Sequence, residues 1–404
     1  MRLTNEELQK LMKQENVDRI WSWSRINCFR TSPFEYLLKY IKCIPEDRQD
    51  CIYTTTGGIA HAILEKLYTN QIKYEDMDAE FEDMWLVAYN VSQLKFDRNN
   101  EENNKRIGDK YYENLKHFFS NHTVIKNKPI IEQFVKVKIG GNLIQGYLDC
   151  CYKDDDGNYN IIDFKTSSMY KGEKAENECG QLVCYALALN QMGIPIEKIR
   201  IAWNFLKYCT IQYYQKNGIC KTRDVERCKI GESLQSNAKM WLKELVYEDQ
   251  ADEYLKMLLD TNSIECLPEE VQEKFSVSDC YVYVPMTQKL IDKWTNEIIS
   301  TIKDIELREA DYSETHNERI WWDNEESVKK QSYYFSTLCG YSPNLHKPYA
   351  EYLSELEAKK SGIDIFDGVG KDIDSQEIVS NKTVCSKNKN KNDDIDFSWL
   401  DEIT

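Results

Sequence analysis

The chain has few of the residues that interrupt regular structure. Its 404 residues include only 16 glycines and 8 prolines, and both are sparse before residue 340. Because these residues mark most turns and loops, the sequence offers few breaks over that length. No repeat recurs at a fixed period, which argues against a solenoid or a propeller.

Long apolar runs and an excess of positive charge are also missing. No stretch reaches the roughly 18 consecutive apolar residues that suggest a membrane-spanning helix, and the polar, helix-patterned first ten residues predict neither a secretory signal nor an anchor. The 52 Lys and Arg are outnumbered by 68 Asp and Glu, for a net charge of −16. A protein that binds nucleic acid through its overall electrostatic field is usually basic. If this chain binds nucleic acid, we therefore expect it to do so through a locally basic cleft. The side chains that we expect to line one, unless they form a solvated face, are Lys207, Lys221, Arg223 and Arg227.

The 14 cysteines show no framework spacing. We therefore expect free thiols in a reducing cytoplasm, that of a bacterial host cell if the chain is phage-encoded. Hydrophobic residues make up 41% of the chain, which is enough for the core of one large domain or two.

The most informative pattern is a predicted β-hairpin that carries acidic residues. Residues 143–152 and 159–165 are rich in β-branched and aromatic residues, and Asp155-Asp156-Gly157-Asn158 supplies the turn between them. Side chains at i and i+2 of a strand share a face. Asp163 and Lys165 therefore project together, and Asp149 can meet them from the neighbouring strand.

Two carboxylates beside one ammonium group suggest a metal-dependent nuclease. Hard cations held by carboxylates neutralise the charge that develops during phosphodiester hydrolysis, and they lower the pKa of a bound water. Oxygen ligands favour Mg²⁺ or Mn²⁺ over Zn²⁺, and the Phe164 carbonyl lies between the two side chains as a further ligand.

Two predicted helices add polar pairs at i,i+4 spacing, which places each pair on one helix face. An amphipathic helix opens after Thr54-Thr55-Thr56-Gly57-Gly58 and carries His61 and Glu65, and another over about 175–191 carries Gln181 and Tyr185. His61 can offer a ring nitrogen to a metal. In isolation each pair can also be ordinary, the first a solvated contact and Tyr185 a core tyrosine.

These motifs together resemble the RecB-like branch of the PD-(D/E)XK nuclease superfamily, and within it the CRISPR-associated and phage exonucleases. Residues 57–65 look like the family's first helical motif, Gly146 to Asp149 like the second, Asp163 to Ser167 like the third, and Gln181 to Tyr185 like its Gln-x-x-x-Tyr helix. Order and spacing agree over about residues 20–215. The third motif has Asp where many relatives have Glu.

The resemblance implies a division of roles. Asp149, Asp163, His61 and the Phe164 carbonyl are expected to hold Mg²⁺ or Mn²⁺, and Lys165 to orient or activate water. The residues expected to position DNA are Gln181, Tyr185, Glu65 and Lys207.

The function that this implies is a DNA exonuclease of phage or bacterial recombination, replication or end processing. Two alternatives stay open. One is a catalytically silent DNA-binding or assembly subunit that keeps the nuclease fold, and the other is a scaffold that acts through the C-terminal tail.

The expected fold is a restriction-endonuclease-like α/β core, with a mixed sheet flanked by helices. Residues 1–230 form this core, with a helical insertion at about 70–125, and 231–357 form a mostly helical addition packed on it. Further predicted elements are helices at 4–15, 31–41, 231–262 and 287–311, and strands at 131–139, 200–205, 210–214 and from Cys280 to Pro285.

We expect no iron–sulfur cluster, although several relatives bind one through a cysteine before the first motif and three near the domain's end. Cys28 is suitably placed. The later cysteines lack the close spacing that such a cluster uses: they are Cys266, Cys280, Cys339 and Cys385.

The end of the chain differs in composition. Residues 358–391 are polar and irregular, as in a flexible linker. Residues 392–404 interleave acids with large apolar residues, among them Asp394, Ile395, Phe397 and Trp399. As a hypothesis, this tail recruits a single-stranded-DNA-binding, recombination or replication protein, or covers the chain's own DNA cleft; a solubilising tail is the plain alternative.

Overall fold

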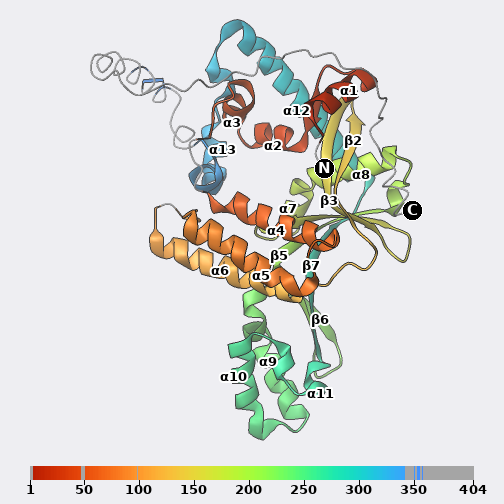
Figure 1. The fold of residues 1–404 in the computed structure, drawn as a ribbon, viewed down its shortest axis with the longest axis vertical. Coiled ribbons are helices and arrows are strands. Elements are labelled where there is room, and N and C mark those ends of the chain that lie inside the picture. The colour runs from red at the N-terminus through yellow and green to blue at the C-terminus, as the bar shows by residue number, and fades with distance from the viewer. Residues whose placement is uncertain are drawn as a thin grey trace.

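A seven-stranded mixed sheet forms the centre of the protein. The structure is a computed structural model, and it describes residues 3–46, 51–97 and 99–341, with positions 350, 353, 354 and 357. The strand order is β1-β3-β4-β5-β6, with β2 paired to β3 and β7 paired to β5. The strands are β1 (Ile20–Ser22), β2 (Ile130–Ile139), β3 (Asn142–Lys153), β4 (Tyr159–Lys165), β5 (Ile199–Tyr214), β6 (Cys220–Glu226) and β7 (Phe275–Val284). Helices flank this sheet (Figure 1), which confirms the predicted α/β class.

Helices from distant parts of the chain cover the sheet. They are α1 (Asn5–Glu15), α2 (Trp23–Thr31), α3 (Pro33–Tyr36), α4 (Ile52–Tyr68), α5 (Met77–Trp85), α6 (Glu101–Asn121), α7 (Glu173–Glu178), α8 (Gly180–Gln191), α9 (Ile230–Glu244), α10 (Ala251–Thr261), α11 (Glu269–Gln272), α12 (Gln288–Thr315) and α13 (Glu325–Lys330). Short π-helical turns follow α3, α5 and α13, at Leu37–Ile41, Leu86–Val91 and Tyr334–Leu338.

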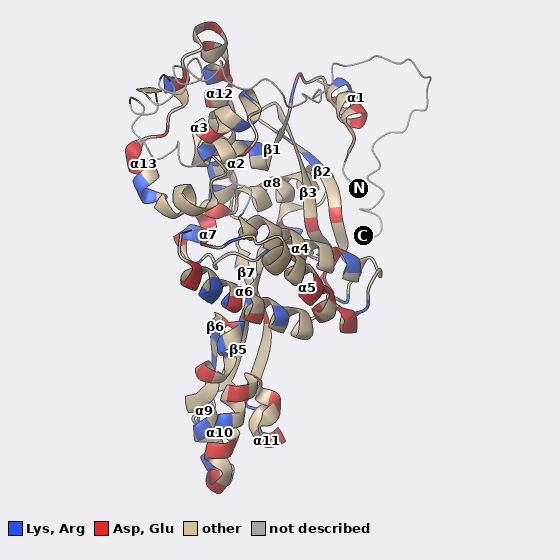
Figure 2. Cartoon of the chain, turned by 60° about the vertical axis from the view of Figure 1, so that its left-hand side comes forward, with Lys and Arg blue, Asp and Glu red and all other residues tan. Residues whose placement is uncertain are grey.

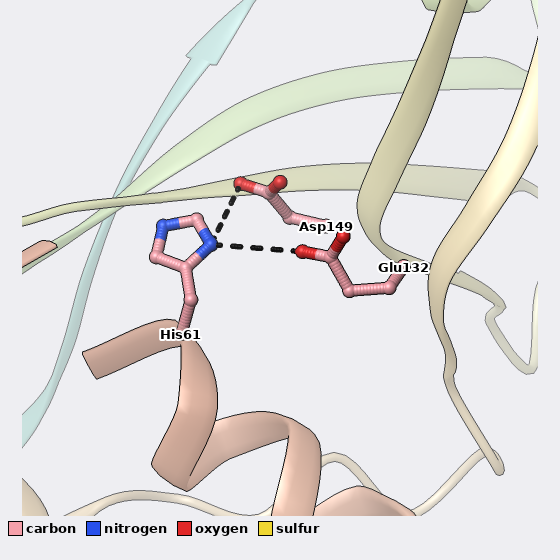
Figure 3. A group of neighbouring side chains, drawn as sticks. All are labelled: His61, Glu132 and Asp149. Atoms are coloured by element: carbon pink, nitrogen blue, oxygen red, sulfur yellow. Dashed lines mark ion pairs between the residues drawn. The ribbon is translucent and has the colours of Figure 1, made fainter. Parts of the chain in front are cut away.

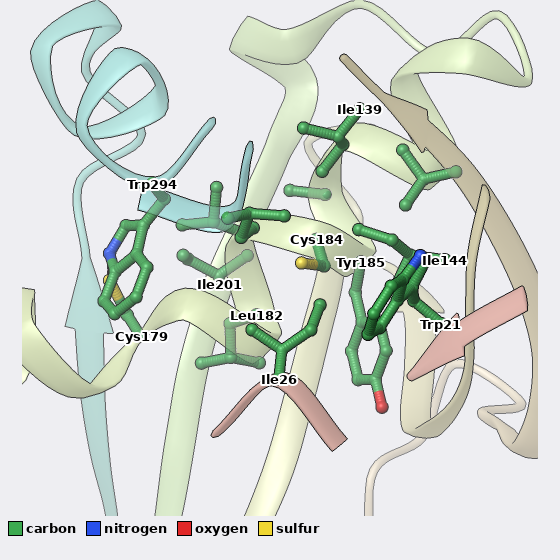
Figure 4. Close-up of a cluster of buried hydrophobic side chains, with 14 of the residues drawn as sticks. Trp21, Ile26, Ile139, Ile144, Cys179, Leu182, Cys184, Tyr185, Ile201 and Trp294 are labelled. Carbon is green, nitrogen blue, oxygen red and sulfur yellow. Dashed lines mark hydrogen bonds between the residues drawn. The ribbon is translucent and has the colours of Figure 1, made fainter. Parts of the chain in front are cut away.

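Two apolar clusters, one on each face of the sheet, position the site. Ile161 of β4 belongs to the cluster under α2, α8 and α12, and its neighbour Ile162 to the cluster under α4, α5 and α6. Trp294 of α12 lies in the first cluster beside Cys179 (Figure 4). Because β4 has neighbours on both edges and both faces, nearly all of its residues are buried. A buried strand leaves little freedom to the polar side chains that it carries.

Helices α9, α10 and α11 form a unit that projects from one end of the sheet (Figure 1). The 16-residue strand β5 continues past the main sheet between β6 and β7, and these three strands support a separate small core. Strand β7 then returns along β5 into the sheet, and α12 packs against α2 and α8. The described part of residues 231–357 thus contributes to the projecting unit and to the main body, while the predicted domain division stays a prediction.

Several predicted boundaries are wrong for identifiable reasons. Helix α4 begins at Ile52 and includes Thr54 to Gly58, because Ile52 and Thr56 are fully buried and the Thr56 hydroxyl donates a hydrogen bond to the Ile52 carbonyl. The two strands expected at 200–205 and 210–214 are one strand, and the helix expected at 175–191 is broken at Cys179. Tertiary packing overrides local pattern at each of these places.

A buried polar network joins the core to the projecting unit. The Asp279 carboxylate of β7 accepts hydrogen bonds from Arg227 at 2.5 Å and His122 Nδ1 at 2.7 Å, and His122 Nε2 meets the Tyr68 hydroxyl at 2.6 Å. Arg227 is 1% exposed and also donates to the Leu206 carbonyl. The idea that Arg227 lines a basic cleft is therefore wrong, because a salt bridge inside the protein already satisfies its charge.

Charged residues of both signs alternate along the outer helices, as Figure 2 shows for α6, α9 and α10. Lys221 and Arg223 lie on β6, in the stem of the projecting unit. Across the described residues, no helix combines the length and the apolar character that crossing a bilayer requires.

We predict that Asp279→Asn destabilises the fold by about 3 kcal/mol, because it leaves the buried Arg227 without its counterion. Burial raises the pKa of Asp279, but the His122 hydrogen bond and the charges of His122 and Arg227 outweigh it, so the net pKa is lowered. A lowered carboxyl pKa stabilises the fold above the unfolded value of about 3.9, and this stabilisation disappears as the pH falls through the lower folded pKa.

Urea unfolding at several pH values measures this effect. The difference in the free energy of unfolding between wild type and Asp279→Asn should shrink below about pH 4. Asp260→Asn, which alters an exposed acid on α10, should unfold with the same free energy as wild type at every pH. A constant difference between wild type and Asp279→Asn would mean that the Asp279 charge is not what stabilises the network.

Candidate active site

A tight turn sets the register of the strands that carry the acidic residues. Gly140 and Gly141 both have positive φ and connect β2 to β3, with Ile139 paired to Asn142. Such a two-residue turn determines every later pairing in the hairpin. Ile131 pairs with Cys150 and Gln133 with Leu148, so Glu132 lies opposite Asp149.

Glu132 was not among the residues expected from the sequence. The Gly140-Gly141 turn was the available signal, because counting back from it places Glu132 across from Asp149. Its φ of 51° lies in the left-handed region, which is unusual for a residue other than glycine within a strand. Strained backbone of this kind is concentrated at functional sites.

His61 reaches the same point from α4, on the face of the sheet that α4 covers. Its Nε2 lies 3.0 Å from the Phe164 carbonyl, which can only accept a hydrogen bond, so the proton of the neutral ring belongs on Nε2. The lone pair of Nδ1 then faces Asp149 Oδ2 at 3.7 Å and Glu132 Oε1 at 4.0 Å (Figure 3). In the structure, the Phe164 carbonyl therefore accepts the hydrogen bond that orients His61.

Asp163 and Lys165 lie beside this group at the end of β4. Lys165 Nζ is 2.6 Å from Asp163 Oδ2, and Asp163 is 2% exposed. Asp149 is buried next to Asp163 and accepts a hydrogen bond from the Phe164 amide at 3.3 Å. The structure therefore brings together Asp149, Asp163 and Lys165, as the spacing in the sequence predicted.

The electrostatics of these three residues are those of a site short of positive charge. Burial raises the pKa of Asp149 well above its usual range, and the neighbouring Asp163 charge raises it further. Burial lowers the pKa of Lys165, but the charges of Asp163 and Asp149 outweigh this, so the net pKa is raised. Lys165 is therefore an ammonium ion, and Asp149 tends to keep its proton unless a cation replaces it.

The donor atoms of His61, Glu132 and Asp149 fit a divalent metal ion. One ligand atom from each lies within 4.8 Å of the other two, and the set combines one neutral imidazole nitrogen with two carboxylates. Carboxylates suit Mg²⁺ and Mn²⁺, and imidazole binds many transition metals. These three residues, with Asp163 behind them, are the ones that would hold such an ion.

Two cavities open from the His61 and Glu132 side chains. The narrower one, the inner cavity, has a volume of about 300 Å³ and lies among α2, β3 and α8. The wider one, the outer cavity, has about 550 Å³ and follows α4 along Thr54, Gly58 and Glu65. Neither is lined by a lysine or an arginine among the described residues, so an anion entering them meets no fixed cation in their walls.

Gln181 and Tyr185 line the inner cavity together. Gln181 Nε2 donates a hydrogen bond to the Tyr185 hydroxyl at 2.9 Å. The Tyr185 ring packs directly over Gly146 of β3, where any Cβ would collide with it. Glycine is needed at that position because α8 must approach the sheet closely enough to bring both polar side chains to the site.

The remaining predicted site residues are more scattered. Glu65 is exposed and lines the outer cavity, one turn along α4 from His61. Lys207 is 8% exposed, with its ammonium group 3.6 Å from the centre of the Tyr111 ring, and lines neither cavity. Burial lowers the pKa of Lys207 to about 7. The tail residues Asp394, Ile395, Phe397 and Trp399 lie outside the described residues.

The cysteines considered for a cluster lie in different places. Cys339 donates a hydrogen bond to Glu35. Burial raises the pKa of the nearby Cys28 thiol, and the charges of Glu35 and Cys339 raise it further. Cys266 follows α10, Cys280 is buried in β7, and Cys385 lies outside the described residues. Burial raises the pKa of Cys339 as well, so both neighbouring thiols stay protonated.

Comparison with known proteins agrees with this geometry. A family model described as the PD-(D/E)XK nuclease superfamily matches residues 20–319. A solved structure titled "Crystal structure of SSO0001" matches at 14% identity over 48% of this chain and 75% of that one, with a TM-score of 0.16, which is too low to carry an argument. No curated protein matches the chain significantly.

We predict that Mn²⁺ raises the thermal unfolding temperature, and that this increase grows as the pH rises from 5 to 8. The raised pKa of Asp149 means that the folded protein holds a proton which the unfolded chain releases above about pH 4, so burying this carboxyl costs stability as the pH rises. A bound cation replaces the proton and removes that cost.

We expect Glu132→Gln to weaken Mn²⁺ binding by at least roughly tenfold, because losing even a residue that only supports a metal ligand costs about that much affinity. Titration calorimetry measures the change. Glu265→Gln, on the projecting unit, is the matched control. Equal affinity in the two variants would remove Glu132 from the set of ligands.

Proposed function

Because the chain belongs to the PD-(D/E)XK nuclease superfamily, we propose that it is a Mg²⁺- or Mn²⁺-dependent DNA exonuclease of phage or bacterial recombination, replication or end processing. The observation that carries this proposal is the convergence of His61, Glu132 and Asp149 beside the Asp163–Lys165 pair. Three separate elements, α4, β2 and β3, supply those three donors.

The charge balance of the site supports phosphodiester chemistry. Even with Asp149 protonated, the carboxylates of Glu132 and Asp163 outnumber the single ammonium group of Lys165, so the protein alone would repel a phosphate. A bound divalent cation supplies the missing positive charge and lowers the pKa of the attacking water. In the neutral ring, the hydrogen bond from His61 Nε2 to the Phe164 carbonyl leaves the lone pair on Nδ1, which is the tautomer that a metal ligand at this position needs.

Lys165 acts as a charged donor in this proposal. Since its pKa is raised, it cannot take a proton from water near neutral pH. Its ammonium group instead orients the attacking water or stabilises the negative charge that develops on the phosphate oxygens. Asp163 restricts the position of the ammonium group through the 2.6 Å contact between them.

The choice of exonuclease over endonuclease is supported by the unequal cavities on either side of the metal-binding group. An internal phosphodiester needs an open path in both directions. Here the outer cavity along α4 is wide, whereas the inner cavity is bounded by the start of α2, by β3 and by α8. A strand end suits this shape better than a continuous duplex.

We predict that Asp163→Ala and Lys165→Ala each reduce degradation of end-labelled linear DNA by about a hundredfold to a thousandfold, a loss like that of a key electrostatic group. EDTA should abolish the same reaction in the wild type. Gel analysis of the labelled products with Mg²⁺ or Mn²⁺ measures the effect.

Asp156→Ala, which removes an exposed acid in the β3–β4 turn, is the matched control and should keep full activity. Circular dichroism should show that all three variants stay folded. DNA binding without cleavage by the wild type would favour the silent binding subunit, and neither binding nor cleavage would favour the scaffold.

A further inference from the structure

We propose that the inner cavity binds the terminal nucleotide of the DNA strand, so that the enzyme releases mononucleotides from a free end. This inference rests on the proposed nuclease function and adds to it the site that recognises the end. The cavity shares His61, Glu132 and Asp149 with the metal-binding group. A nucleotide inside it would therefore have its linking phosphate at the reacting centre.

Trp23 gives this cavity a rigid aromatic wall. Its ring packs edge-on against Trp294 at 5.5 Å between centroids, and it lies so close to Gly180 that a Cβ there would collide with it. Trp23 nevertheless remains partly exposed and lines the cavity. An aromatic ring held in this way offers a stacking surface for a base, and stacking tolerates any base sequence.

The start of α2 supplies polar groups at the same wall. The Ser22 side chain accepts a hydrogen bond from the Arg25 amide, and the amides of Trp23 and Ser24 in the first turn have no acceptor within the helix. Amides at a helix N-terminus favour anions. These amides are the groups of the inner cavity that favour an anion, and in this proposal they receive the phosphate of the terminal nucleotide.

Gln145 adds a hydrogen-bonding side chain to the wall of the same cavity. It lines the inner cavity from β3, and its Oε1 is buried without a hydrogen-bond partner in the structure. A buried amide oxygen left unpaired costs free energy. A sugar hydroxyl or a base amino group is a donor of the kind that would satisfy it.

The size of the inner cavity limits what it can hold. About 300 Å³ is at the lower end of the roughly 300–1,000 Å³ typical of small-ligand sites, which suits one nucleotide and not a duplex. The rest of the strand would leave through the outer cavity, where Gly57 and Gly58 of α4 carry no side chain. Hydrolysis at the metal-binding group between the two cavities would then release one nucleotide at a time.

Ser24→Glu tests this without disturbing the fold, because Ser24 is exposed in the first turn of α2, where an acidic residue stabilises a helix. The added carboxylate should repel the terminal phosphate and reduce mononucleotide release by at least about tenfold. Ser300→Glu, an acid added to an exposed position of α12 that lines neither cavity, is the matched control and should be unaffected.

A binding measurement separates recognition from catalysis. In an Asp163→Ala background, Trp23→Ala should weaken the binding of a short end-labelled oligonucleotide by roughly fivefold to a hundredfold, the range expected for one lost stacking contact. Trp23→Phe, which keeps an aromatic ring, should retain most of the affinity that Trp23→Ala loses. Fluorescence anisotropy gives the affinities, and chromatography of wild-type digests gives the product sizes.

The outcomes also distinguish this inference from the proposed function. The wild type and Ser300→Glu should also hydrolyse bis(p-nitrophenyl) phosphate with Mg²⁺ or Mn²⁺, because this small diester needs no terminal-nucleotide site. If the wild type degrades DNA but releases oligonucleotides, or if Ser24→Glu matches Ser300→Glu, the terminal-nucleotide site is wrong and the nuclease stands. If the wild type hydrolyses neither the small diester nor DNA with any metal, both are wrong.

Discussion

Two buried carboxyl groups placed side by side govern the chemistry of this protein. Asp149 and Asp163 cannot both be charged in a buried site unless positive charge is nearby, because burial and mutual repulsion both raise the free energy of the ionised pair. Lys165 compensates for one of the two negative charges. The remaining deficit makes the site a receptor for a cation, and it explains how a protein with a net charge of −16 can belong to a family that acts on a polyanion.

Close packing around α8 determines the shape of the site. Gly146 lets the Tyr185 ring lie on β3, and Gly180 lets α8 meet Trp23 and Trp294. Packing of this density transmits the positions of core side chains to the polar groups at the cavity rim. The large cluster that holds Trp21, Ile144, Leu182 and Tyr185 (Figure 4) is therefore part of what positions Gln181 and the proposed wall for a nucleotide.

The projecting unit is attached to the body in a different way. Its own apolar core is separate, and the buried network of Arg227, Asp279, His122 and Tyr68 lies where its stem meets α4 and α6. Buried ion pairs contribute little net stability compared with apolar packing, but they tolerate few alternative arrangements. The network is thus suited to holding the stem in one orientation relative to the sheet.

Local sequence pattern determined β3, β4 and the hairpin that joins them, and with it the meeting of Asp149, Asp163 and Lys165, because strand alternation and turn chemistry act over a few residues. The family resemblance added His61, Gln181 and Tyr185. Tertiary structure alone decided that α4 starts at Ile52, that Arg227 is buried, and that His61 from α4 meets Asp149. These features depend on contacts between elements far apart in the chain, and the burial that selects them exists only once the sheet and its helices have assembled.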